Sequence, residues 1–104
     1  MGSEKKNNTI VELLNQVRRA NSDEKFLELL NLGGNACALE IAKSQNATPS
    51  ILDYLLRFRP VAIRHAVAKN NNTSISTLEA LTSDSEMLVR DSAKVNLLLR
   101  ASVR

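Results

Sequence analysis

The segment VAIRHAVAKNNNTSISTLEAL, residues 61–81, determines the fold that the sequence predicts. Apolar side chains recur at helical spacing in 61–69 and again in 75–81, and a polar run over 70–74 separates the two stretches. Asparagine, threonine and serine are typical of turns and of helix N-caps. The segment therefore predicts two short helices joined by a polar turn.

This helix pair belongs to a unit that recurs along the chain with a period of 26, which is the offset between Phe26, Leu52 and Leu78. Short helix pairs cannot bury their apolar faces alone, so consecutive pairs are expected to stack around one continuous core. The chain of 104 residues accommodates about four such units, and it is predicted to be all-α. The apolar columns at this offset are Phe26, Leu52 and Leu78; Leu29, Leu55 and Leu81; and Val11, Cys37, Ile63 and Val89.

Local signals set the expected helix boundaries. Helices are predicted near 9–20, 22–32, 35–44, 49–58, 60–69, 74–82 and 85–101, the last being one longer helix that closes the stack. Residues 1–8 are expected to form a flexible N-terminal tail before a single domain over 9–104. The expected N-caps are Thr9, Ser22, Thr48 and Ser83, with Pro49 and Pro60 as first helical residues and Gly33–Gly34 as a left-handed helix end. Ser76 has capping-box spacing with Glu79 and is expected either at the N-cap or a residue or two inside its helix.

Composition excludes several classes of protein. Only 3% of the residues are aromatic, which is too few for a platform that stacks bases. The single Cys37 cannot form an internal disulfide or supply the thiolates of a metal cluster, so no cofactor and no metal are expected. The sequence has no long apolar run, and we expect a cytoplasmic protein without a membrane partner.

The positive charge is concentrated in the second half of the chain. The formal net charge is +3. Residues 1–52 carry six basic and six acidic side chains, whereas residues 53–104 carry eight basic and five acidic ones. This mild excess is compatible with nucleic acid but is well short of a basic DNA-binding arm.

The repeat resembles a known family in the stretches IRHAVAKNNNTS (63–74), LEALTSD (78–84) and LVRDSA (88–93). These are similar to the blocks V-R-x-x-V-A-x-N-P-x-T-P, L-x-x-L-A and D-P of the leucine-rich repeat variant family. The resemblance implies a right-handed α-α superhelix of the armadillo type, in which each unit pairs an α-helix with a second, sometimes 3₁₀, helix. HEAT-like repeats, which share the Val-Arg pair, are the next most similar class and imply the same fold.

The departures from that family also carry predictions. The period of 26 is longer than the family's usual one, and Asn71 and Ser74 stand where proline is typical. These changes predict second helices that are longer and more α than 3₁₀. Some relatives carry an iron-sulfur cluster on an added cysteine motif, which a chain with only Cys37 does not reproduce.

The candidate binding residues begin with two arginines at one repeat position. Arg64 and Arg90 are one period apart, and in a stacked solenoid they would lie on one face as a basic ladder that Arg57 and Arg59 extend. Guanidinium groups suit carboxylate and phosphate alike. In the alternative interpretation, an arginine of this ladder pairs with an acidic residue of the adjacent loop, such as Asp84, and only links successive units.

Other polar residues are expected to assist the ladder. His65, Lys69, Asn70 and Lys94 are the proposed helpers in partner binding. His65 is the only histidine and has no carboxylate at helical spacing, so it is not expected to be catalytic. The run 70–72, with Gln45 and Asn46 one unit earlier, is explained either as a polar rim that binds a ligand or as turn chemistry.

The function that we predict is that of a non-enzymatic scaffold, which binds another protein through a concave, partly basic face. Non-specific binding of nucleic acid by the basic C-terminal half is one alternative. Homotypic assembly through the C-terminal helix, where residues 97–99 are all leucine, is another. The sequence contains no Gly-rich phosphate loop, no HExxH and no Gly-x-Ser-x-Gly motif, so an enzyme is not expected.

Overall fold

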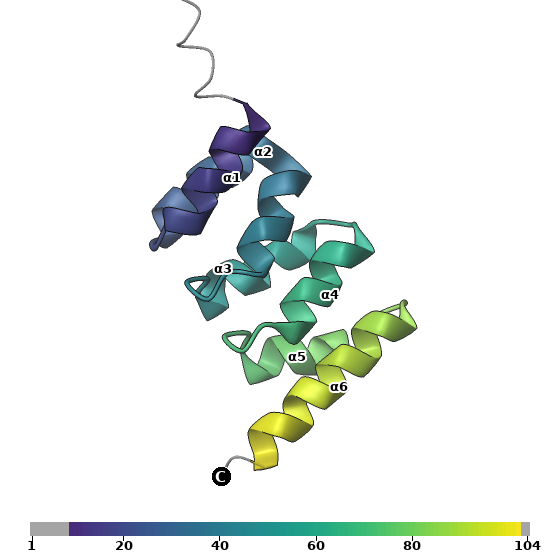
Figure 1. The fold of residues 1–104 in the computed structure, drawn as a ribbon. Helices are drawn as coiled ribbons and strands as arrows, with labels where there is room; N and C mark the ends of the chain where they lie inside the picture. Colours follow the sequence, from purple (N-terminus) through teal and green to yellow (C-terminus); the bar gives the residue numbers. More distant parts are fainter. Residues whose placement is uncertain (1–8, 103–104) are drawn as a thin grey trace, which may run out of the picture.

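A computed structural model describes residues 9–102, which fold into helices and loops without a β-strand (Figure 1). The predicted tail over 1–8 lies outside the described residues. The molecule is elongated, with extents of 55 × 28 × 16 Å. The elements are α1 (Ile10–Arg19), α2 (Asp23–Ala42), α3 (Pro49–Tyr54), the 3₁₀ helix η2 (Leu55–Arg57), α4 (Val61–Lys69), α5 (Ile75–Leu81) and α6 (Met87–Ser102).

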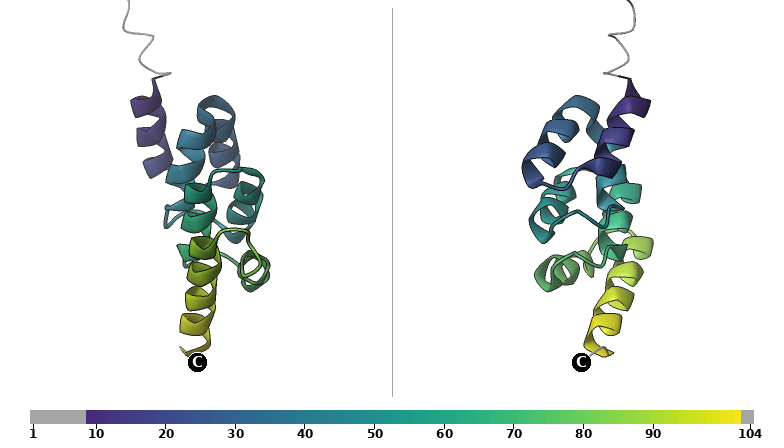
Figure 2. Two further views of the ribbon diagram at one scale, coloured as in Figure 1. Left: turned by 90° about the vertical axis from the view of Figure 1, so that its right-hand side faces the viewer. Right: turned by 60° about the vertical axis from the view of Figure 1, so that its left-hand side comes forward.

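The helices form two layers. Figure 2 shows α1, the second part of α2, α4 and α6 along one side, and the first part of α2, α3 and α5 along the other. Contacts between α2 and α4 and between α4 and α6 join the members of the first layer. Successive elements of the chain thus alternate between the layers.

Three N-caps recur with the period of the sequence and start the helices of the second layer. The hydroxyl oxygens of Ser22, Thr48 and Ser74 each accept a hydrogen bond from the backbone N–H three residues ahead, at 3.2, 3.2 and 3.1 Å. Each bond satisfies a donor that the first helical turn leaves without a partner. Polar residues at a fixed interval therefore set where these helices begin.

The predicted apolar columns form the core. In the two columns that begin at Phe26 and Leu29, every side chain is at most 4% exposed. Cys37, Ile63 and Val89 of the third column are at most 2% exposed. These burial predictions are confirmed.

The fourth member of that column, Val11, is a wrong prediction because it is 65% exposed. The reason is a shorter loop in the first unit. Five positions separate the buried Val17 from the N-cap Ser22, whereas seven separate the buried Val67 from the N-cap Ser74. A shift of two residues turns a helix by about 200°, which points Val11 away from the core.

Asparagine side chains link consecutive units through repeated bonds. The Nδ2 of Asn70 donates to the carbonyl oxygens of Ala42 at 2.8 Å and Ser44 at 3.0 Å. One period later, Nδ2 of Asn96 donates to the carbonyls of Ala68 and Asn70 at 2.9 and 3.1 Å. A hydrogen-bonding pattern with the period of the sequence therefore joins neighbouring loops.

Gly34 divides α2 into two helical parts. Its φ of 57° and ψ of −134° lie outside the helical region, and the positive φ is favourable for glycine. Gly33 has no room for a side chain, because a Cβ atom there would lie 2.3 Å from the sulfur of Cys37 in the second part of the helix. The predicted break at the glycine pair is confirmed, but the ψ of Gly34 is not that of a left-handed helix end, and the two parts follow each other without a loop.

The structure settles the position of Ser76 and corrects other local predictions. Ser76 lies inside α5, because Ser74 is the cap, and Pro60 is the N-cap residue of α4 and not its first helical residue. Before α6, Oδ1 of Asp84 accepts from the backbone N–H of Glu86 at 2.9 Å, in place of a cap by Ser83. The second-layer helices are mainly α, as predicted, with a 3₁₀ turn only after α3.

Candidate functional site

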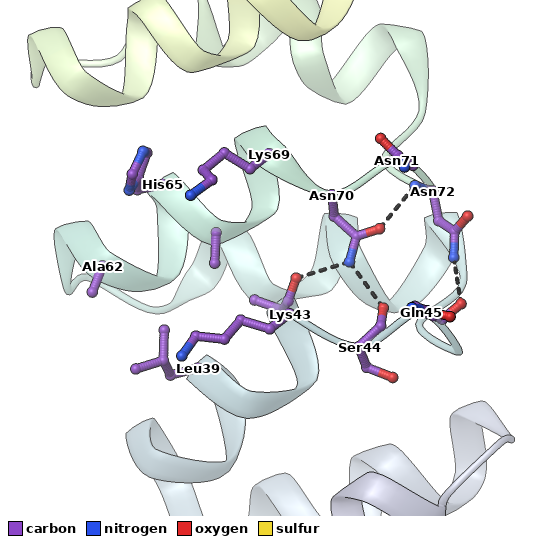
Figure 3. Close-up of a pocket in the computed structure, with 12 residues that line it drawn as sticks. Leu39, Lys43, Ser44, Gln45, Ala62, His65, Lys69, Asn70, Asn71 and Asn72 are labelled. Atoms are coloured by element: carbon purple, nitrogen blue, oxygen red, sulfur yellow. Dashed lines mark hydrogen bonds between the residues drawn. The ribbon is translucent and has the colours of Figure 1, made fainter.

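A groove lies between the second part of α2 and α4 (Figure 3). Its volume is about 780 Å³. The two helices form its walls and the two polar turns that follow them close one end. It is lined by Leu39, Ala42, Lys43, Ser44, Gln45, Ala62, His65, Ala66, Lys69, Asn70, Asn71 and Asn72.

Two lysines at equivalent positions give the groove its charge. Lys43 and Lys69 are one period apart, at the C-terminal ends of α2 and α4, where a cation interacts favourably with the helix dipole. Both side chains are exposed. Among residues 9–102, the ion pairs are Arg18–Glu40, Lys25–Glu28 and Arg64–Asp84, so neither groove lysine has a carboxylate partner there.

His65 lies beside Lys69 on the α4 wall (Figure 3). Partial burial, and secondarily the positive charge of Lys69, lower the pKa of the imidazole from its ordinary value. Both effects favour the neutral form of the ring. The charge of the groove at neutral pH comes from its lysines.

The end of the groove that the two polar turns close carries amide side chains. Asn70 and Asn72 are engaged: Nδ2 of Asn72 donates to the carbonyls of Gln45 at 2.8 Å and Ala47 at 2.9 Å (Figure 3). The side-chain amides of Asn71 and Gln45 form no hydrogen bond within the part of the chain that the structure describes. These two amides can donate to and accept from a bound molecule.

Two smaller hollows continue the groove along the same layer of helices. One of about 430 Å³, between α4 and α6, shares His65, Lys69 and Asn71 with the groove. The other, of about 300 Å³ between α1 and α2, shares Lys43 and Gln45 with it. The hollowed surface therefore extends from α1 to α6.

Arg64 lies apart from the groove and pairs with its own chain. Its Nε and Nη2 donate to the two carboxylate oxygens of Asp84 at 2.9 and 3.0 Å, and its Nη1 donates to the carbonyl of Arg59. The side chains of the pair are only 17% and 9% exposed. The Arg64 guanidinium, more than any other group, holds the pKa of Asp84 below its usual value. The pairing that the alternative interpretation expects, between this arginine and an acidic residue of the adjacent loop, is thus present for Arg64.

Arg90 repeats part of this arrangement. Its Nη1 donates to the carbonyls of Asp84 at 2.9 Å and Ser85 at 3.1 Å. Ser85 lies one period after Arg59, whose carbonyl Arg64 contacts in the same way. Both arginines of the predicted ladder therefore donate to loops of this chain.

The other predicted site residues are divided between the groove and the surface elsewhere. His65, Lys69 and Asn70 line the groove, whereas Arg57, Arg59 and Lys94 do not. The guanidinium carbon of Arg57 lies 4.7 Å from the centre of the Tyr54 ring. Gln45 and Asn71 line the groove too, and they belong to the polar rim that was one of two interpretations of these turns. Lys43 was not among the predicted site residues, although its repeat offset from Lys69 could have revealed the lysine pair.

Cys37 is buried in the core at 0% exposure, as predicted. Burial, with a smaller effect of the Glu40 charge, raises the pKa of its thiol. A thiol in that state is a poor nucleophile.

The remaining chemistry of the described residues is limited. They contain no group of three or more His, Cys, Asp or Glu side chains that could hold a metal ion. None of the helices in residues 9–102 combines the length and hydropathy that crossing a membrane requires. The groove can act through charge, hydrogen bonds and shape.

Comparison of the chain with protein-family profiles, with curated proteins and with solved structures gives no significant match. The resemblance to the leucine-rich repeat variant family thus stays a prediction from the sequence.

Proposed function

We propose that this chain is a non-enzymatic scaffold that binds another protein in the groove between α2 and α4. The observation that carries the proposal is that some cationic side chains of the chain have an internal carboxylate partner and others do not. Lys43 and Lys69 face an open groove without a carboxylate partner in residues 9–102, whereas Arg64 is paired with Asp84. A cation that lacks an internal partner is available to a ligand.

The proposed architecture is a right-handed superhelix of about four armadillo- or HEAT-like units. Three features support it: the N-caps at Ser22, Thr48 and Ser74, the buried columns at the same interval, and the repeated bonds of Asn70 and Asn96. In such a stack, the hollowed layer of helices would be the concave face. Repeat scaffolds of this kind present extended concave surfaces to their partners.

A photo-cross-linking amino acid at Ala62 tests the proposed location. Ala62 is exposed and lines the groove, whereas the control position Ala80 is exposed on α5 outside it. In nuclease-treated extract of the source cells, we expect a protein adduct from position 62 and none from position 80. Equal adducts from both positions, or adducts that disappear with nuclease, would contradict the proposal.

Binding of nucleic acid by the C-terminal half has less support. Arg64 and Arg90 are occupied by Asp84 and by loop carbonyls, and Arg100 donates to the carbonyls of Asn70 and Asn71. Fewer cations of this half are therefore free for phosphate. The nuclease arm of the cross-linking experiment separates the two functions.

Homotypic assembly is a second candidate because α6 exposes several apolar side chains. Monomeric proteins seldom leave a large contiguous apolar surface uncovered. Light scattering at two protein concentrations tests it, and a monomer at the higher one would remove it. The exposed fractions are 63% for Met87, 56% for Leu88, 53% for Val95, 69% for Leu98 and 60% for Leu99.

A further inference from the structure

We propose that the ligand of the groove is an extended acidic peptide segment. In this complex, carboxylates of the peptide contact Lys43 and Lys69, and its backbone pairs with the side-chain amides of Gln45 and Asn71. This inference rests on the proposed function, since it names the chemistry of the partner that the groove receives.

The charges around the groove favour an acidic ligand. The nearest carboxylate on the α2 wall, that of Glu40, is 3.5 Å from Nε of Arg18 and lines the neighbouring hollow instead. Asp91 lines the hollow on the other side, between α4 and α6. The lining of the groove itself contains the two lysines, His65 and no acidic residue. A ligand carboxylate therefore meets attraction without a competing anion in the groove.

The arrangement of the polar groups indicates an extended chain. In Figure 3, the side chains of Lys43 and Lys69 reach toward one end of the groove, and Gln45 and Asn71 lie at the other. A small anion would contact only the first end. A peptide in an extended conformation carries a donor and an acceptor on each residue, and so it can use the amides as well as the lysines.

The groove walls are unsuited to the bases of a nucleic acid. Apart from its polar groups, the lining of the groove is aliphatic, with Leu39, Ala42, Ala62 and Ala66. No Phe, Tyr or Trp side chain lines the groove as a platform for base stacking, and Phe26 is buried in the core. Of the two acidic macromolecules, a protein segment fits this lining better.

Fluorescence anisotropy with a defined probe tests the inference. The probe is a labelled peptide of about eight residues that alternates Ser and Glu, and its control replaces every Glu with Gln, so that only charge differs. We expect the acidic peptide to bind about tenfold more tightly than its neutral control, and its affinity to fall as the ionic strength rises. Equal affinity of the two peptides, or no binding of the acidic one, would overturn the inference.

Two matched double variants locate the binding. Lys43→Gln with Lys69→Gln should weaken the acidic peptide about tenfold. Arg19→Gln with Arg59→Gln removes the same charge from exposed positions outside the groove and should change the affinity by less than about twofold. An equal loss in both double variants would show attraction by net charge alone and would contradict the site.

The same variants separate this inference from the function on which it rests. If cross-linking from Ala62 persists in the Lys43→Gln, Lys69→Gln variant while the acidic peptide does not bind to the wild type, the groove binds a protein of other chemistry. If position 62 gives no protein adduct and the acidic peptide does not bind either, the groove is rejected as the binding surface. A thymine oligonucleotide that displaces the peptide at equal concentration would show that the cations bind phosphate instead, and would overturn the inference.

Discussion

Asn70 and Asn71 are neighbours with the same side chain and both line the groove, but only Asn70 is also bonded to a neighbouring loop of this chain. The first is part of the seam between units, which we define as the internally bonded side chains of Arg64, Asn70, Arg90 and Asn96. The second belongs to the groove, where its amide makes no hydrogen bond within residues 9–102. The seam serves the fold, and the groove retains unused polar groups.

The two regions show that a repeated cation does not by itself mark a binding site. Arg64 and Arg90 recur with the period of the chain, and so do Lys43 and Lys69. The arginines contact the carboxylate and carbonyls of a loop, whereas the lysines have no such contact. Guanidinium groups offer five donors in a fixed plane and thus suit a bonded link between loops.

Both regions depend on the same buried columns, and the largest expected effect comes from breaking one of them. Leu78 is 0% exposed, whereas Ile75 on the same helix is 46% exposed. Leu78→Ala should lower the free energy of unfolding by about 2 to 5 kcal/mol because it leaves a cavity. Ile75→Ala should lower it by less than about 1 kcal/mol. Urea denaturation followed by circular dichroism measures both, and similar small losses would contradict the core assignment.

Removing Arg64 from the seam should have the next largest effect on stability. Arg64→Leu deletes two hydrogen bonds to a carboxylate that is only 9% exposed, and should cost about 2 to 3 kcal/mol. Its groove counterpart Lys69→Leu should change stability by no more than about 0.5 kcal/mol. The same urea titration compares them. A Lys69 variant as unstable as the Arg64 variant would remove the distinction between seam and groove.

The asparagines permit a similar comparison at a smaller scale. Asn96 is 7% exposed, and Asn96→Ala leaves the carbonyls of Ala68 and Asn70 without its amide, at an expected cost of about 2 kcal/mol. Asn71→Ala should stay within about 0.5 kcal/mol. Thermal unfolding of the two variants provides the measurement, and equal melting temperatures would contradict the assignment of Asn96 to the seam.

The smallest expected effect is the pH dependence of the seam. Because the folded pKa of Asp84 is lowered, its ionised carboxylate stabilises the fold fully above its unfolded-state pKa of about 3.9. That contribution is lost as the pH falls through the lower folded pKa. The stability gap between wild type and Asp84→Asn, about 1 kcal/mol at pH 7, should therefore close in acid. Asp91→Asn is the control at pH 7, where it should change the stability little, since Asp91 forms no ion pair in residues 9–102.

The sequence predicts the helices and the core because both follow from local spacing. Phe26, Leu52 and Leu78 could be found by their interval alone. The exposure of Val11 could not, because it depends on a loop that is two residues shorter in the first unit.

The candidate site was harder to predict. The pairing of Arg64 with Asp84, 20 residues away, could be stated only as one of two interpretations, since sequence spacing does not show where a loop carboxylate lies. The polar groups that the groove offers to a ligand likewise depend on which side-chain amides are hydrogen-bonded within the turns. Asn70 and Asn72 are engaged and Asn71 is not, although the three are chemically identical.

The central claim is that the seam stabilises the fold and the groove binds. The most direct test measures urea stability and the cross-linking yield from Ala62 on two double variants, Arg64→Gln with Arg90→Gln and Lys43→Gln with Lys69→Gln. We expect the arginine variant to lose about 2 kcal/mol or more and to keep its yield under native conditions. The lysine variant should keep its stability and lose most of its yield. A stable arginine variant that no longer cross-links, beside a lysine variant with full yield, would contradict the account.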